Sequence, residues 1–129
     1  MSYNYTKKSQ YSFLETIDEL LLSFWENWFW LVSNVDVTEK VSKKVDKDFP
    51  NYKILGFCKP EIAYKYLSED MNLWVFLPCS ICVYEKDWSV YISSWLPEDI
   101  ISNFIENKDL KNLDIEISIL IKKIIDDIS

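Results

Sequence analysis

Two short motifs near the middle of the chain decide the fold. The first reads GFCKP at residues 56–60, and the second reads LPCSICVYE at residues 77–85. Apolar and polar residues alternate along the second motif, a pattern typical of a β-strand with one buried face. In the first motif a strand ends, and Pro60 stands where the first turn of a helix accepts proline. The two motifs therefore predict two strands joined through a short helix.

Regular patterns on both sides of these motifs extend the prediction along the chain. Ser12 and Glu15 form a capping box that opens a helix with apolar residues at three- and four-residue spacing. The order of the elements predicts a single α+β domain over residues 1–129, with a mostly antiparallel sheet and helices packed on one face. The expected strands span residues 3–6, 29–37, 52–57, 75–77 with 80–85, and 89–95, and the expected helices span residues 12–27, 38–45, 61–68, 97–105 and 113–128.

The composition excludes several classes of function. The chain has no histidine and no arginine, and its 14 basic residues are all lysine in a chain of net charge −7. Without histidine there is no histidine-based triad, general base or metal ligand, and three cysteines are too few for a four-thiolate zinc site. Because the lysines form no basic cluster, we expect no nucleic-acid binding. We see neither a membrane span nor a secretion signal, so we expect a cytoplasmic protein that does not associate with membranes.

The two motifs resemble those of the domain of unknown function 302 family of small bacterial and archaeal proteins. The resemblance is strongest over residues 29–96 and weaker at either end, including the C-terminal helix region at residues 106–129. It implies an architecture similar to that of the TATA-binding protein and assembly into a homodimer, without implying DNA binding. Within the shared motif, Gly56, Pro60 and Pro78 are expected to form the scaffold. The matching residues are Tyr52, Ile54, Leu55, Gly56, Cys58, Pro60, Ala63, Tyr64, Leu77, Pro78, Cys79, Val83, Tyr84 and Glu85.

Cys58 and Cys79 are the residues of the shared motif best suited to chemistry. Cys58 directly precedes a predicted helix, whose N-terminal dipole lowers the pKa of a thiol and favours the thiolate. If the strands that carry Cys58 and Cys79 are neighbours, the two sulfurs meet at one end of the sheet and can bind a small molecule or a soft metal such as Cu(I). Glu85 is a candidate acid or base beside them, or a solvated carboxylate at a turn. The alternative for both cysteines is that they are small buried hydrophobic residues.

The content of tryptophan and glycine is unusual, since six tryptophans accompany a single glycine, Gly56. About nine glycines are usual for this length. Trp88 follows Asp87 between two predicted strands, where Asp-Gly is a favoured turn, and Trp28 ends a predicted helix, where glycine is the usual terminator. One interpretation is that UGA codons for glycine were translated as tryptophan; the alternative is six genuine tryptophans that fill core and surface positions. The suspected positions are Trp25, Trp28, Trp30, Trp74, Trp88 and Trp95.

Three hypotheses of function follow from the sequence. The first is a ligand-binding or accessory protein whose site, around Cys58 and Cys79, takes a small molecule or a soft metal. The second is a thiol-dependent redox protein or enzyme that uses the same cysteines. The third is a structural module that acts by forming a homodimer. The sequence identifies no cofactor and no catalytic residue.

Overall fold

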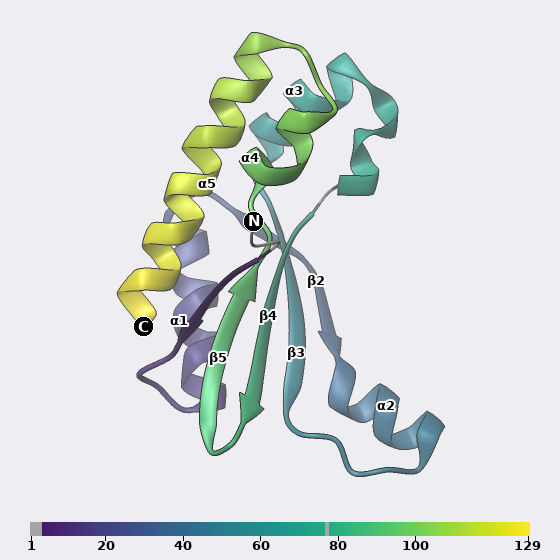
Figure 1. Ribbon diagram of the computed structural model, residues 1–129, viewed down its shortest axis with the longest axis vertical. Coiled ribbons are helices and arrows are strands. Elements are labelled where there is room, and N and C mark those ends of the chain that lie inside the picture. Colours follow the sequence, from purple (N-terminus) through teal and green to yellow (C-terminus); the bar gives the residue numbers. More distant parts are fainter. Residues whose placement is uncertain (1–3, 77) are drawn as a thin grey trace.

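One antiparallel β-sheet forms the centre of the structure (Figure 1). The computed structural model describes residues 4–76 and 78–129. Across the described residues the strands lie in the order β1-β5-β4-β3-β2, so β1 and β2 are the edge strands. Every pairing between neighbours is antiparallel, as the sequence predicted. The strands are β1 (Tyr5–Lys8), β2 (Trp30–Asp36), β3 (Tyr52–Cys58), β4 (Cys79–Lys86) and β5 (Ser89–Ser94).

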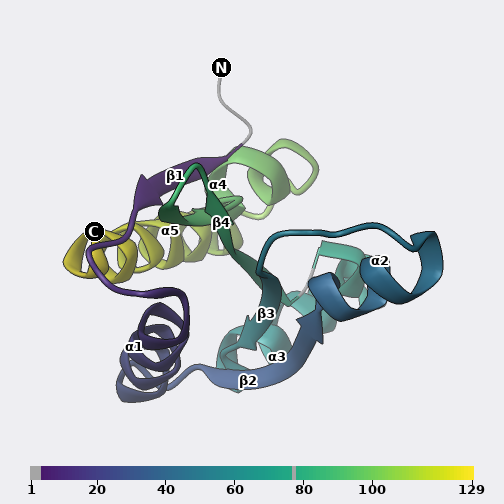
Figure 2. The same ribbon diagram turned by 90° about the horizontal axis from the view of Figure 1, so that it is seen from below.

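The helices are distributed unevenly around this sheet. α1 and α5 lie on the same side of it, α3 and α4 lie beyond its upper end in Figure 1, and α2 projects away from the rest of the chain in Figure 2. Consistent with that position, α2 contributes no buried residue. The helices are α1 (Phe13–Glu26), α2 (Val37–Val45), α3 (Pro60–Glu69), α4 (Pro97–Ile100) and α5 (Lys108–Ile128), with short 3-10 helices η1 (Met71–Phe76) and η2 (Ile101–Asn103).

α1 begins at the capping box that the sequence predicted. Ser12 Oγ accepts a hydrogen bond from Glu15 N at 3.2 Å and donates one to Glu15 Oε1 at 2.8 Å. The apolar side of the helix is buried through Leu20 and Phe24. The ring of Phe24 stacks on that of Phe57 in β3, with centroids 4.1 Å apart. These contacts hold α1 against the sheet.

α5 supplies the other large part of the core. Its isoleucines recur at three- and four-residue spacing, and the buried face includes Ile117, Ile121, Ile124 and Ile128. Charged residues lie on the remaining faces together with the exposed Ile115 and Ile119. No helix in the described part of the chain is both long enough and apolar enough to cross a bilayer.

Several elements differ from the sequence prediction. The residues expected to lead into β4 form η1 instead, and Leu77 lies outside the described residues. The helix predicted at 97–105 divides into α4 and η2. The last helix begins at Lys108, five residues before the predicted start. Asn107 caps it, because Asn107 Oδ1 accepts hydrogen bonds from the backbone N–H groups of Asp109 and Leu110. The first turn is mostly polar, so the spacing of apolar residues did not reveal it.

Candidate functional site

The two motif cysteines lie at the same end of neighbouring strands. Cys58 is the last residue of β3 and Cys79 is the first residue of β4. The antiparallel register pairs Phe57 with Cys79, so Cys58 lies one residue beyond that pair. Both cysteines line one small cavity, which we call the thiol cavity, together with residues of α3, α4 and α5.

Both thiols are shielded from solvent, since Cys58 is 8% exposed and Cys79 is 5% exposed. Burial raises the pKa of the Cys58 thiol. Burial, reinforced by the nearby Cys58 and Asp114, raises the pKa of Cys79 from 9.0 to about 12. The sequence predicted a lowered pKa for Cys58 from the N-terminus of α3, but the loss of water around the sulfur raises it. Both side chains are therefore protonated thiols near neutral pH.

The thiol cavity is too small for an organic ligand. Its volume is about 10 Å³, which is about the space that one water molecule needs. A larger molecule reaches the sulfurs only after some of the lining residues have moved. Besides the two cysteines, the cavity is lined by Phe29, Phe57, Lys59, Ile62, Ala63, Tyr66, Pro97, Ile101 and Ile117.

A buried tyrosine–aspartate pair adjoins the thiols. The hydroxyl of Tyr66 in α3 donates a hydrogen bond to Asp114 Oδ1 in α5, and both residues are buried. Burial, followed by this bond, raises the pKa of Tyr66. The pair was not predicted from the sequence, although Asp114 gives a signal, since it stands between Leu110 and Ile117 on the apolar face of a helix. The hydrogen bond ties α3 to α5 beside the two cysteines.

The motif glycine and prolines shape the same end of the sheet. A Cβ atom on Gly56 would lie 2.1 Å from Ser33 Oγ and 2.7 Å from Pro78 Cγ, so any side chain there requires both neighbours to shift. Strand β2 bulges between Leu31 and Ser33 at this point. Pro60 lies in the first turn of α3, where its missing N–H costs no helical hydrogen bond. These contacts fix the backbone on either side of the cysteines.

Glu85 lies at the opposite end of β4 from the thiols. It lies six positions along the strand from Cys79, a distance of about 20 Å in an extended chain. Its Oε1 accepts a hydrogen bond from Asn51 Nδ2, and its backbone N–H donates to Asn51 O at 3.0 Å. Cys58, Cys79 and Glu85 therefore do not form one site.

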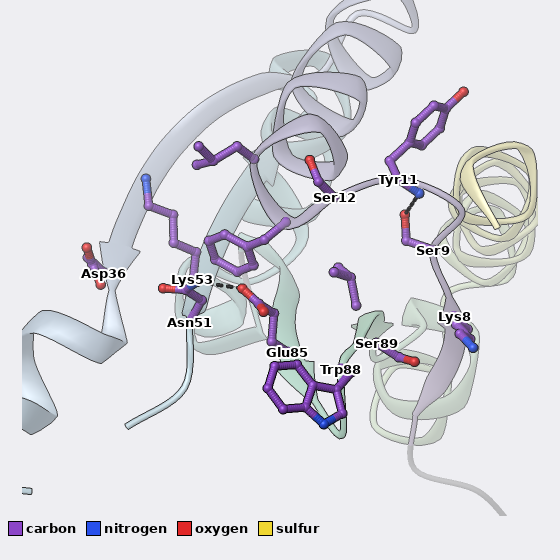
Figure 3. A pocket seen from close by; sticks show the side chains of 13 residues that line it. Lys8, Ser9, Tyr11, Ser12, Asp36, Asn51, Lys53, Glu85, Trp88 and Ser89 are labelled. Carbon is purple, nitrogen blue, oxygen red and sulfur yellow. Dashed lines mark hydrogen bonds between the residues drawn. The ribbon is translucent and has the colours of Figure 1, made fainter. Parts of the chain in front are cut away.

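Glu85 instead lines an open cleft on the same side of the sheet as α1 (Figure 3). The cleft has a volume of about 800 Å³ and lies among the β1–α1 connection, the end of β2, the residues at the start of β3 and the β4–β5 hairpin. These segments are far apart in the sequence, which explains why no local motif indicated the cleft. Its lining residues are Lys8, Ser9, Tyr11, Ser12, Phe13, Leu14, Asp36, Asn51, Lys53, Glu85, Trp88, Ser89 and Val90.

Charged groups of both signs surround this cleft. In Figure 3, Glu85 lies between Lys53 on one side and Lys8 on the other. Neither lysine forms an ion pair within the described parts of the chain. Asp36 lies at the rim, where its Oδ1 accepts from Glu39 N at 3.0 Å and caps α2. The cleft thus presents two lysines and two carboxylates, and neither lysine is held in an ion pair within the described residues.

A metal centre has little support from the side chains. Among residues 4–76 and 78–129, no group of three or more histidine, cysteine, aspartate or glutamate side chains is arranged to hold a metal ion. The thiol cavity offers two sulfurs from Cys58 and Cys79. Any metal there would depend on these two ligands, and both would have to lose a tightly held proton.

Two of the six suspected tryptophans have an unusual backbone. Trp28 has φ 67° and Trp88 has φ 68°, both in the left-handed region that favours glycine. The other four suspected positions, Trp25, Trp30, Trp74 and Trp95, have no positive φ. The local geometry that suggested glycine from the sequence is therefore present at two positions.

The fold and the central motif define a small α+β protein built on one antiparallel sheet. Residues 5–128 match the domain of unknown function DUF302. A solved structure, described as the crystal structure of an uncharacterized conserved protein DUF302 from Bacillus stearothermophilus, is similar over 100% of both chains with a TM-score of 0.90 and 25% identity. No match to a curated protein was found. The chain belongs to the DUF302 family.

Proposed function

We propose that this protein binds a small polar molecule in the cleft beside Glu85. The observation that carries the proposal is the contrast in size between the two ends of the sheet. The cleft measures about 800 Å³ and the thiol cavity about 10 Å³, whereas ligand sites in proteins commonly measure about 300–1,000 Å³. The ligand-binding hypothesis therefore moves from Cys58 and Cys79 to the cleft.

The lining of the cleft favours a ligand that carries both charges. An anionic group such as a carboxylate suits Lys53 or Lys8, and Glu85 suits an ammonium or hydroxyl donor. The two lysines balance the two carboxylates of Asp36 and Glu85, although the whole chain has a net charge of −7. The charges in the cleft therefore cancel, and a zwitterion meets no net repulsion there. An anion, in contrast, is repelled by the acidic surface of the rest of the chain. We propose a zwitterion of amino-acid type as the ligand class.

Nuclear magnetic resonance of ¹⁵N-labelled protein tests this proposal. The probes are L-glutamate, L-lysine and L-alanine, which are zwitterions with acidic, basic and apolar side chains. We expect at least one probe to shift amide signals concentrated at residues 8–14, 51–53 and 85–90. The substitutions Lys53→Met and Glu85→Gln should weaken binding because each removes one charged contact with the ligand.

The matched controls are Lys40→Met and Glu106→Gln, which change charge at exposed positions outside the cleft. Both controls should bind the probe as the wild type does. Absence of shifts with all three probes at millimolar concentration would refute a zwitterion site. Equal weakening by the cleft variants and the controls would show a general charge effect in place of a site.

A second candidate function rests on the two thiols that line one cavity. Both cysteines border the same small cavity, and the register places Cys58 one residue beyond the Phe57–Cys79 pair. Two cysteine sulfurs suit a soft ion such as Cu(I). The raised pKa values argue against the redox or enzymatic alternative, because a nucleophilic cysteine needs its thiolate near neutral pH.

Anaerobic titration of the reduced protein with Cu(I), in competition with a coloured chelator, tests this second candidate. One equivalent should bind, and the double variant Cys58→Ser, Cys79→Ser should lose that binding. Cys82→Ser should retain it, since Cys82 does not line the thiol cavity. Absence of stoichiometric uptake would dismiss the metal site and leave the cleft proposal untouched.

A further inference from the structure

Trp28 occupies the position after a helix where glycine normally reverses the chain. Phe29 N donates to Phe24 O at 2.9 Å and Trp28 N donates to Trp25 O at 3.0 Å. These two hydrogen bonds define a Schellman motif at the end of α1, and Trp28 is its left-handed residue with φ 67°. The hydrophobic contact that usually accompanies the motif is also present, because the rings of Phe24 and Phe29 meet edge to face at 5.3 Å.

Trp88 occupies the second position of a two-residue hairpin turn. The pair Lys86–Ser89 closes the β4–β5 ladder, leaving Asp87 and Trp88 as the loop. Their φ angles are 51° and 68°. A two-residue turn with positive φ at both positions is of type I′, in which Asp-Gly is a preferred sequence. A bulky side chain at the second position is strained because its Cβ approaches the backbone.

The side chains of Trp28 and Trp88 gain little by packing in return for this strain. None of the six belongs to the buried hydrophobic core of the described residues. Five are exposed, from 46% at Trp74 to complete exposure at Trp88. A tryptophan normally buries a large area and contributes strongly to a core or interface. The fold therefore makes no use of the indole rings at Trp28 and Trp88.

We infer that the protein made in its natural host has glycine at positions 28 and 88. The printed tryptophans then arise from UGA codons, which one bacterial code reads as glycine and another reads as tryptophan. The composition agrees, because the chain has one glycine and six tryptophans. Since the same transfer RNA decodes every UGA, any of Trp25, Trp30, Trp74 and Trp95 encoded by UGA is glycine as well, although its backbone does not require it.

This inference changes which surfaces can serve as sites. A surface hollow of about 280 Å³ is bounded largely by Trp25, Trp28 and Trp30, and one of about 530 Å³ lies between Trp28 and Trp30 and the residues at 59–61. With glycine at these positions the aromatic surface disappears, so we assign it no partner. The cleft loses one side chain, Trp88, and keeps Lys53 and Glu85. The charged groups that carry the proposed ligand site, Lys53 and Glu85, therefore do not depend on the identity of position 88.

Peptide mass spectrometry of the protein isolated from its own host decides the matter. Cleavage after lysine releases residues 9–40, which contain position 28, and residues 87–108, which contain position 88. Fragment ions should show glycine at both positions. Tryptophan at either position would overturn the inference.

Recombinant variants test the backbone reasoning separately. Trp28→Gly and Trp88→Gly should each raise the temperature of half-unfolding, because glycine adopts positive φ without strain. Trp25→Gly is the matched control, since Trp25 is an exposed tryptophan within α1, where glycine is the poorer helix former. It should lower the unfolding temperature. A lower unfolding temperature for Trp28→Gly or Trp88→Gly would contradict the inference.

Discussion

Alkaline pH is expected to destabilise the fold through the buried thiol of Cys79. In the unfolded chain this thiol loses its proton near its ordinary pKa of 9.0, whereas in the folded protein it keeps the proton up to about pH 12. Between these values the folded state holds a proton that the unfolded state has released, so stability falls as pH rises. Below pH 9 both states hold the proton, and the contribution is constant. The loss is about 1.4 kcal/mol per pH unit, hence about 3 kcal/mol between pH 9 and pH 11.

Urea unfolding of the wild type and of Cys79→Ala at pH 7.5, 9, 10 and 11 measures this loss. Other alkaline groups with raised pKa values, including Cys58, Tyr66 and Tyr5, are present in both proteins and largely cancel in the difference. At pH 7.5 the wild type should be more stable by about 1–2 kcal/mol, because the variant leaves a small cavity. This difference should shrink above pH 9 and change sign by pH 11.

The half-exposed Cys82 provides the matched control, since its sulfur does not line the thiol cavity. Cys82→Ala removes a thiol from the chain without opening the buried site. A difference between wild type and Cys79→Ala that stays constant from pH 8 to pH 11 would refute the reasoning. It would mean that water reaches the sulfur and that the cavity is open.

Four further predictions follow from the same contacts. Gly56→Ala should destabilise the protein by about 1–3 kcal/mol in urea unfolding, because its Cβ overlaps Ser33 and Pro78; an unchanged midpoint would show that both neighbours yield freely. Iodoacetamide should label Cys82 in the native protein, and Cys58 and Cys79 only after unfolding; peptide mapping that finds Cys79 labelled first would contradict this order. Tyr66→Phe should cost about 1–3 kcal/mol, because it removes a donor from the buried carboxylate of Asp114; a neutral effect in thermal unfolding would argue that water replaces the hydroxyl. The homodimer stays a prediction from the family resemblance. We expect it to use the sheet face on which the ring of Tyr84 stacks with that of Tyr52 at 5.3 Å and with that of Tyr91 at 5.6 Å. Light scattering should show a dimer that Tyr84→Lys dissociates, and a monomeric wild type would contradict the prediction.

The sequence predicted the elements whose signals are local. β4 and β5 follow from their alternation and from the turn at Asp87, and α1 follows from its capping box. The pairing of β1 with β5 joins Tyr5 to Ser94, and no local pattern specifies a partner so far along the chain. The prediction failed at η1 because periodicity alone does not assign a short apolar run to a strand.

The candidate site shows the same division between local and distant information. That Cys58 and Cys79 lie on neighbouring strands is consistent with the shared motif, because both cysteines flank the same short helix. The direction of the pKa shift of Cys58 was predicted wrongly. That shift depends on how completely α3, α4 and α5 cover the sulfur, which the sequence does not show. The cleft depends on four distant segments, so it was visible only in the structure.

The two ends of β3 and β4 have opposite properties, and this contrast places the proposed function. At one end, apolar side chains and the Tyr66–Asp114 hydrogen bond enclose the thiols and leave space for about one water molecule. There a small polarisable residue fills the space between Phe57 and the helices, which accounts for cysteine without any chemistry. At the other end, Lys53 and Glu85 face an open cleft. A site that exchanges its ligand with solvent needs exposed polar groups on a rigid sheet. The cleft end of the sheet provides such groups, and for this reason we place the proposed ligand site there.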